Sequence, residues 1–190
     1  MLKTELLEYF LNEVTAKRNI KRTAYSFSND LEEVLGQARL LDIQKQGDMT
    51  TIRETGGNEN RYTFFRYSDN WELLKKLVEE QFQEEVISTG YYWYPYGGYC
   101  GWHSNSNDIG ERIYLVWAQE AGKSFLRYQD PESKKIITDW DQQGWQFKRF
   151  TISSEPLFWH CIGSYTNRVS LGFKVLPVPK STLESSDSAP

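Results

Sequence analysis

Residues 94–105 read Tyr-Pro-Tyr-Gly-Gly-Tyr-Cys-Gly-Trp-His-Ser-Asn, and they carry the first of only two histidines in the chain. The aromatic residues of this stretch favour a half-buried strand, and Gly97-Gly98 permits a tight turn with positive φ before it. Residues i and i+2 of a strand face the same side, so His103 and Asn105 are predicted to point into one space. A strand face of this kind is typical of a site at the mouth of a barrel.

Short strand patterns separated by turn signals continue on both sides of this stretch. We expect strands at 88–95, 99–105, 112–118, 123–129, 134–139, 145–152, 157–162 and 168–175. Turn signals such as Asp130-Pro131 and Gln143-Gly144 lie between them. Eight short strands with such turns predict a mainly β fold, a barrel or jelly roll.

The region before the barrel predicts helices that support it. Helical spacing of apolar residues predicts one helix from Leu2 to about Thr15. A second is expected over 31–35, capped by Ser28-Asn29-Asp30 and stopped at Gly36. The strongest helix opens at Ser68-Asp69-Asn70, and its apolar stripe consists of Trp71, Leu73, Leu74, Leu77, Val78 and Phe82.

The segment 38–66 has a weaker pattern. It contains apolar runs such as Leu40-Leu41-Asp42-Ile43 and Tyr62-Thr63-Phe64-Phe65 around a Gly56-Gly57-Asn58 loop. Two or three strands or irregular segments are expected there.

Length and composition set the domain organisation. The 190 residues suffice for one domain with its own core, so we predict a single domain over 1–176, made of a helical and mixed support (1–87) and a β core (88–176). Residues 177–190 are rich in serine and proline and predict a flexible tail. No signal peptide or apolar membrane span is evident, so a cytoplasmic location is expected.

The charge pattern bears on partners. The formal net charge is −4, which disfavours nucleic acid as a partner. The one basic cluster, at residues 17–22, is predicted to end the first helix. Cys100 and Cys161 are expected as reduced thiols that face away from the histidines, because neighbours in a strand alternate between its faces.

The second histidine stands before a further polar pair. His160 ends the run Leu157-Phe158-Trp159-His160, and Arg168-Val169-Ser170 follows eight residues later. Arg168 and Ser170 are predicted to share one strand face. An arginine there can pair with a buried carboxylate through two parallel hydrogen bonds.

In their order, these features resemble the Fe(II)/2-oxoglutarate-dependent oxygenases, and their Tyr-x-x-Gly-Gly approach is similar to the prolyl-hydroxylase-like branch. The resemblance covers about residues 88–176 and implies a double-stranded β-helix. It also implies iron held by His103, Asn105 and His160, and 2-oxoglutarate held by Tyr94, Arg168 and Ser170. The implied cofactors are Fe(II) and 2-oxoglutarate, with ascorbate as a reductant.

The sequence departs from the family at Asn105, where its His-x-Asp motif has a carboxylate. Three alternatives follow. Asn105 coordinates iron through its amide oxygen, or Asp108 supplies the carboxylate, or the site lacks ordinary hydroxylase activity. The third covers a halogenase-like variant and a non-catalytic or cupin-like ligand-binding barrel.

The resemblance implies a hydroxylase that couples decarboxylation of 2-oxoglutarate to oxidation of a substrate. A small molecule or a protein side chain is the expected substrate. No sequence signature specifies that substrate or the oligomeric state.

Overall fold

The computed structural model describes residues 20–25, 30–46, 59–64 and 69–177, together with residues 5, 8, 9, 11, 12 and 28. In chain order the elements are β1 (Ile20–Tyr25), α2 (Leu31–Leu35), α3 (Gln37–Lys45), β2 (Glu59–Phe64), α4 (Asp69–Phe82), β3 (Val86–Tyr94), β4 (Gly98–His103), β5 (Gly110–Ala118), β6 (Ser124–Gln129), β7 (Ile136–Trp140), β8 (Gly144–Ile152), β9 (His160–Ser164) and β10 (Arg168–Val175).

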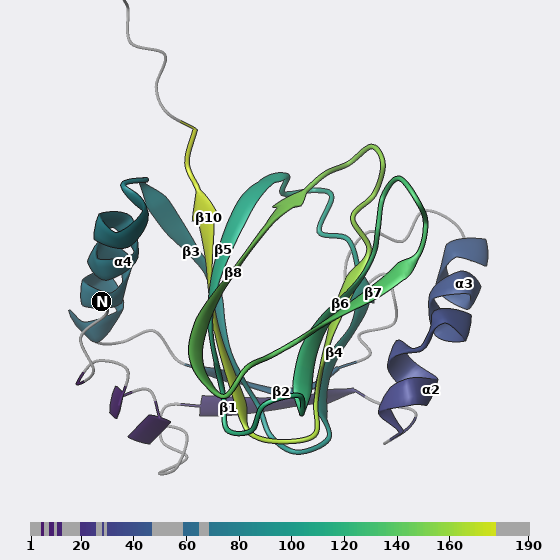
Figure 1. Cartoon of the computed structure of the whole chain (residues 1–190), viewed down its shortest axis with the longest axis horizontal. Coiled ribbons are helices and arrows are strands. Elements are labelled where there is room, and N and C mark those ends of the chain that lie inside the picture. Colours follow the sequence, from purple (N-terminus) through teal and green to yellow (C-terminus); the bar gives the residue numbers. More distant parts are fainter. Residues whose placement is uncertain are drawn as a thin grey trace, which may run out of the picture.

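Eight of the strands form two antiparallel sheets that face each other (Figure 1). One sheet has the order β3-β10-β5-β8, and the other has the order β7-β6-β9-β4. Except between β6 and β7, each strand is followed by a strand of the opposite sheet. This winding makes the fold a double-stranded β-helix, the jelly-roll barrel that was predicted.

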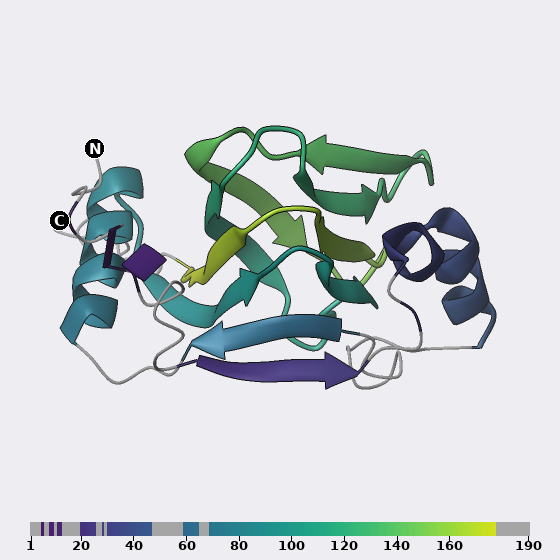
Figure 2. The same cartoon turned by 90° about the horizontal axis from the view of Figure 1, so that it is seen from below.

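The strand β2 joins the two sheets. It pairs with β3 on one side and with β4 on the other, and β1 runs antiparallel along it. Figure 2 shows β1 and β2 side by side, spanning from one sheet towards the other. A segment from outside the eight-stranded barrel therefore closes the gap between its sheets.

The main apolar cores lie on the outer faces of the sheets. Helix α4 covers the sheet that contains β3, where Trp71 stacks on Tyr91 with ring centroids 4.2 Å apart. Helices α2 and α3 cover the other sheet (Figure 1), around Leu35 and Phe125. Because alternate residues of each strand supply these cores, the opposite residues are left to line the space between the sheets.

Trp102 shows how this alternation positions a functional residue. Its indole Nε1 donates to the carbonyl oxygens of Leu35 and Gly36 at the end of α2, at 3.0 and 3.2 Å. These bonds fix Trp102 on the outer face of β4. The next residue, His103, consequently faces inward.

The N-terminal expectations were right in part. Asp30 caps α2 by accepting from the Glu32 amide. Helix α4 buries Trp71, Leu74 and Val78 of the expected stripe, but Leu73 was wrongly included, because it is 39% exposed. The strand or irregular expectation for 40–43 was wrong, because these residues belong to α3, whose i,i+3 pair Leu40 and Ile43 is buried.

The helix-terminus interpretation of the basic cluster was also wrong for its described part. Lys21 and Arg22 lie in β1 and are exposed. Lys17 and Arg18, most of the predicted helix at 2–15, the loop at 56–58 and the tail beyond Pro177 lie outside the described residues.

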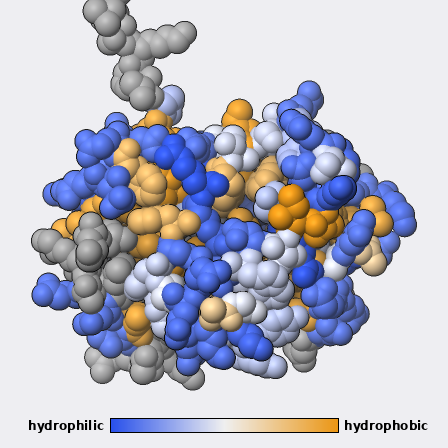
Figure 3. All heavy atoms as spheres, viewed as in Figure 1, coloured by the Kyte–Doolittle hydropathy of each residue, from blue (hydrophilic) through white to orange (hydrophobic). Residues whose placement is uncertain are grey.

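The surface of the face shown in Figure 3 is mostly hydrophilic, with separate apolar patches rather than one continuous one. Among the described residues, no helix combines the length and the apolar character needed to cross a membrane.

Candidate functional site

The two histidines meet between the sheets. His103 is the last residue of β4, His160 is the first residue of β9, and the two are paired in register across these strands. Their ring centroids are 4.1 Å apart and both side chains are buried. Residues 57 positions apart in sequence thus form one pair of possible metal ligands.

Each histidine has one ring nitrogen bound to the backbone. Nδ1 of His103 lies 2.7 Å from the Gly101 carbonyl oxygen, and Nδ1 of His160 lies 3.0 Å from that of Phe158. A carbonyl only accepts, so Nδ1 carries the hydrogen and Nε2 keeps its lone pair. His160 Nε2 is a buried atom without a hydrogen-bond partner among the described residues.

Both rings are neutral at physiological pH. Burial lowers the pKa of His160 to about 4, against the raising effect of the Phe158 carbonyl. Burial, and then the neighbouring His160, lower the pKa of His103 well below its ordinary value. A neutral imidazole with a free Nε2 is the form that binds a transition metal.

Asn105 follows β4 in a turn. It has a φ of +53°, a left-handed conformation that asparagine adopts more readily than most residues, and its carbonyl accepts from the Asp108 amide at 2.9 Å. His103 and Asn105 line the same cavity. The strand ends at His103, however, so the turn rather than strand alternation brings them together.

The expectation for Cys100 was wrong, because it lines the same cavity as His103. The pairing of β4 with β9 shifts register between Cys100 and His103, and this bulge cancels the alternation over three residues. Burial raises the pKa of the Cys100 thiol to about 11, so it is a neutral thiol.

Asp108 is bound to two cations. Its Oδ2 accepts from Arg112 Nη2 at 2.8 Å, and its Oδ1 pairs with Lys174. Among the described residues, no cluster of three or more histidine, cysteine, aspartate or glutamate side chains is arranged to hold a metal. Asn105 and Asp108 both line the cavity that contains His103, and of these two side chains only Asn105 is neutral.

Arg168 is a buried guanidinium with spare donors. Its Nε donates to Asp141 Oδ2 at 2.8 Å, and both side chains are fully buried. Nη1 and Nη2 have no hydrogen-bond partner among the described residues. Two parallel N–H donors on one planar group match the two oxygens of a carboxylate.

Asp141 holds Arg168 in place and is itself held by two further residues. It accepts from Ser124 at 2.6 Å, and its other oxygen lies 3.0 Å from Lys148 Nζ. Burial alone would raise the pKa of Asp141, but the charges of Arg168 and Lys148 and the hydrogen bonds outweigh it and lower that pKa. Lys148 is also paired with Asp139 Oδ2 at 2.6 Å, so two cations and two carboxylates balance in this cluster.

Tyr94 and Ser170 flank Arg168. Tyr94 on β3 pairs in register with Arg168 on β10, and its ring centroid lies 5.5 Å from the guanidinium carbon. Burial raises the pKa of Tyr94, so its hydroxyl stays protonated and can donate. Ser170 is buried two residues further along β10.

Two hollows lie near the histidine pair. The smaller, of about 150 Å³, is the arginine–tyrosine cavity, lined by Arg61, Tyr92, Tyr94, Arg112 and Tyr114 as well as His103 and Asn105.

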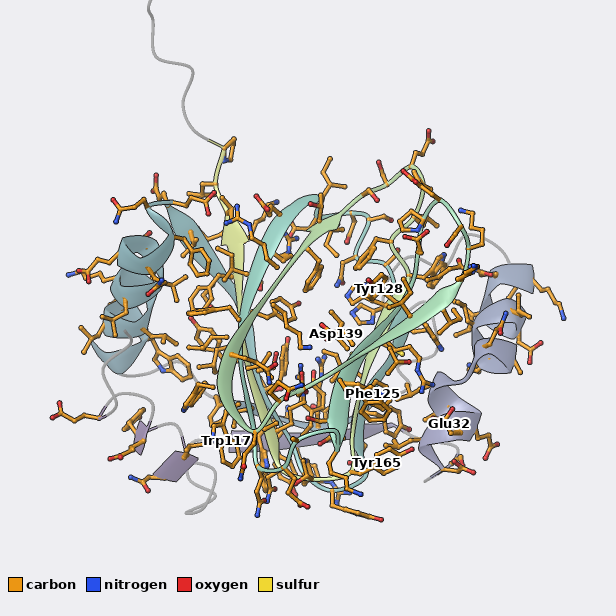
Figure 4. The ribbon with its side chains drawn as sticks, viewed as in Figure 1. Glu32, Trp117, Phe125, Tyr128, Asp139 and Tyr165 are labelled. Carbon is orange, nitrogen blue, oxygen red and sulfur yellow. The ribbon has the colours of Figure 1, made fainter. Side chains whose placement is uncertain are left out.

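The larger hollow, of about 600 Å³, is lined by residues of β6, β7 and β8, including Tyr128, Asp139 and Phe150. Figure 4 shows Tyr128 and Asp139 between the sheets, whereas Phe125 lies on the side of α2. Phe150 and Phe158 line this hollow and pack against His160, with ring centroids 5.7 and 5.3 Å away.

The sequence analysis did not single out Asp141, Lys148 and Arg61 as site residues. Asp141 and Lys148 reach Arg168 only through tertiary structure. Arg61 had a local signal, since Glu59 two residues earlier places an opposite charge on the same face of a strand.

No protein-family model matches the chain, and no curated protein matches it in sequence. Among solved structures, it is similar to a prolyl-4-hydroxylase from Pseudomonas putida, at 12% identity over 90% of this chain and 100% of that one, with a TM-score of 0.48. An oxidoreductase of the 2OG-Fe(II) oxygenase family from Burkholderia pseudomallei shares 10% identity over 90% of each chain, with a TM-score of 0.46.

A prolyl hydroxylase from Trichoplax adhaerens, in complex with a hypoxia-inducible-factor peptide fragment, shares 14% identity over 92% of this chain and 93% of that one, with a TM-score of 0.46. With TM-scores below 0.5, these likenesses assign neither a family nor an activity to the chain. The double-stranded β-helix follows from the strand order alone.

Proposed function

We propose that this protein is an Fe(II)- and 2-oxoglutarate-dependent oxygenase of the hydroxylase type. One observation carries the proposal. Three buried nitrogens in the barrel interior, His160 Nε2 and Arg168 Nη1 and Nη2, have no hydrogen-bond partner among the described residues. Such atoms are costly to bury unless a ligand satisfies them, which supports a metal at His160 and an anion at Arg168.

The residues present fit both groups. His103 and His160 offer Nε2 lone pairs, and Asn105 offers a neutral amide oxygen, a donor set suited to a divalent first-row metal. Arg168 offers a fork for the distal carboxylate of 2-oxoglutarate, and Tyr94 and Ser170 offer hydroxyl donors beside it.

Fe(II) and 2-oxoglutarate would together supply the electrons that activate dioxygen for oxidation of the substrate. The protein's part is to bind, orient and exclude water. Hydrogen bonds to Gly101 and Phe158 fix the ring tautomers, Asp141 fixes the plane of Arg168, and Phe150 and Phe158 shield one side of His160.

Anaerobic addition of Fe(II) and then 2-oxoglutarate tests the proposal. We expect a visible metal-to-ligand charge-transfer band, and succinate once air is admitted. Arg168→Gln should abolish the band, whereas Arg22→Gln, at an exposed arginine of β1, should leave it unchanged. No band and no Arg168-dependent binding of 2-oxoglutarate would refute the proposal.

The alternative is a binding protein that holds the same ligands without turnover, and the neutral Asn105 favours it. The same experiment separates the two. A charge-transfer band that persists in air without succinate indicates binding alone, and a band that decays with formation of succinate indicates an oxygenase.

A further inference from the structure

We infer that Arg61 binds the carboxylate of a small acidic substrate in the arginine–tyrosine cavity, an inference that rests on the proposed function. Arg61 comes from β2, outside the eight-stranded barrel, and lines the cavity together with His103. A substrate bound there lies next to the metal ligand.

The guanidinium of Arg61 is held in one orientation. Its Nε forms an ion pair with Glu59 Oε2 at 2.5 Å, and its carbon lies 3.9 Å from the centroid of the Tyr92 ring. Its Nη1 makes one long hydrogen bond of 3.5 Å to the Tyr94 hydroxyl. The side chain is only 12% exposed, so the guanidinium is already positioned before a ligand binds.

The guanidinium of Arg61 has N–H donors that no described residue uses. A guanidinium has five N–H groups; one donates to Tyr94, and Nε lies close to Glu59 as an ion pair without a hydrogen bond. Among the described residues, no acceptor bonds to its Nη2. The free edge can therefore bind both oxygens of a carboxylate without displacing a protein group.

The other cations that line the two hollows are each bound to at least one carboxylate and use most of their donors. Arg112 donates to the Asp108 carboxylate and carbonyl and to the Glu111 carbonyl. In the larger hollow, Lys148 is bound to Asp139 and Asp141. Arg149 there forms paired bonds with Glu84 and Glu111. Arg61 is thus the lining cation with the most unused N–H donors among the described residues.

The rest of the lining favours an anion. Arg61 and Arg112 are its cations, Asp108 is its anion and is itself shared with Lys174. Tyr114 contributes a hydroxyl donor, because burial raises its pKa to about 12. A carboxylate entering the cavity meets an excess of positive charge and several donors.

The size of the cavity limits the ligand. About 150 Å³ is below the 300–1,000 Å³ that is common for sites of drug-sized ligands. It suits the acid-bearing end of a small molecule. A protein side chain without an acidic group would leave the Arg61 donors unpaired.

Calorimetric titrations with matched acids and amides test this inference. The probes are isobutyrate against isobutyramide and phenylacetate against phenylacetamide. They are added anaerobically to the full chain with Fe(II) and saturating 2-oxoglutarate. We expect each acid to bind at least about tenfold more tightly than its amide, since a charge-assisted bond to arginine is worth about 10- to 100-fold.

Two variants separate a ligand-binding role of Arg61 from a structural one. Arg61→Gln should abolish the preference for acids. Glu59→Gln removes the same ion pair but keeps the cation, so it should retain the preference, and Arg22→Gln on neighbouring β1 is the matched control. Equal losses in Arg61→Gln and Glu59→Gln would assign Arg61 a bracing role and overturn the inference.

Further outcomes are equally decisive. No preference for acids in the unmodified protein overturns the inference, and so does a loss of 2-oxoglutarate binding in Arg61→Gln with acid binding intact. Failure of the proposed function is seen separately, as absence of Arg168-dependent 2-oxoglutarate binding. The acid and amide titrations can then be repeated on the metal-free protein, where an Arg61-dependent preference still supports the anion site.

Discussion

Removing either partner of the Arg168–Asp141 pair should destabilise the metal-free protein, but by unequal amounts. Both side chains are fully buried and joined at 2.8 Å. Breaking a buried pair by removing one partner costs about 3–5 kcal/mol in free energy of unfolding, because an uncompensated charge stays behind.

The surroundings of each residue decide which loss is greater. In Arg168→Met, Asp141 keeps Ser124 at 2.6 Å and Lys148 at 3.0 Å, and two unpartnered donors disappear, so we expect about 3 kcal/mol or less. In Asp141→Asn, Arg168 loses the carboxylate that its Nε binds, so about 5 kcal/mol is expected. The double variant should cost less than the sum of the single ones.

Urea denaturation of the four proteins, with and without 2-oxoglutarate and Mn(II), measures these differences. Ligand at about 100 times its dissociation constant should stabilise the unmodified protein by about 2.7 kcal/mol and should not stabilise Arg168→Met. If Arg168→Met costs as much as Asp141→Asn, or responds to 2-oxoglutarate like the unmodified protein, the assignment of the spare donors to this ligand is wrong.

Three further predictions concern the metal position, the pH dependence and the outer core. Asn105→Asp should tighten Mn(II) or Fe(II) binding about tenfold or more in calorimetry, since a carboxylate adds a charge that the amide lacks. Asp108→Asn should leave the metal affinity unchanged, and a loss of affinity in this variant would identify Asp108 as the ligand. The metal-free protein should lose stability as the pH falls from about 6.5 towards 4, because unfolded histidines take up protons in this range while buried His160 does not. His160 should account for about 3 kcal/mol of the lost free energy of unfolding. A flat pH profile, or an unchanged slope in His160→Asn, would contradict this. Gly163→Ala should lower the free energy of unfolding, measured by thermal denaturation, by about 1–3 kcal/mol, because an added Cβ meets Phe125 at 2.5 Å and Leu35 at 2.8 Å. Unchanged stability would show that α2 can shift to make room at little cost.

The eight barrel strands were predictable because their signals are local. Alternating aromatic residues and turn residues mark each strand without knowledge of its partner. The strand β1 was not predictable in this way, because Lys21 and Arg22 are exposed and only its pairing with β2 makes it a strand. Helix α3 was missed because the run Leu40-Leu41-Asp42-Ile43 contains an i,i+3 pair, Leu40 and Ile43, and an i,i+2 pair, Leu41 and Ile43, so that so short a run fits either period.

The residues of the candidate site were predictable only where their signal is local in the sequence. His103, His160 and Arg168 stood out by residue type and spacing, and the structure brings the two histidines together and buries the arginine among barrel strands. Asp141 and Arg61 did not stand out, because their neighbours are far away in sequence. Proximity across a sheet or between two sheets leaves little trace in a single sequence.

The order of the strands also determines how the chain must fold. The first barrel strand, β3, pairs with the last, β10, so that Val86 lies opposite Val175. The early strand β2 cannot bridge the sheets until β3 and β4 have been made. Contacts so distant in sequence slow folding to milliseconds or longer. During synthesis on the ribosome, the barrel can therefore form only after almost the whole chain has emerged, and no fragment ending before β10 should acquire stable structure.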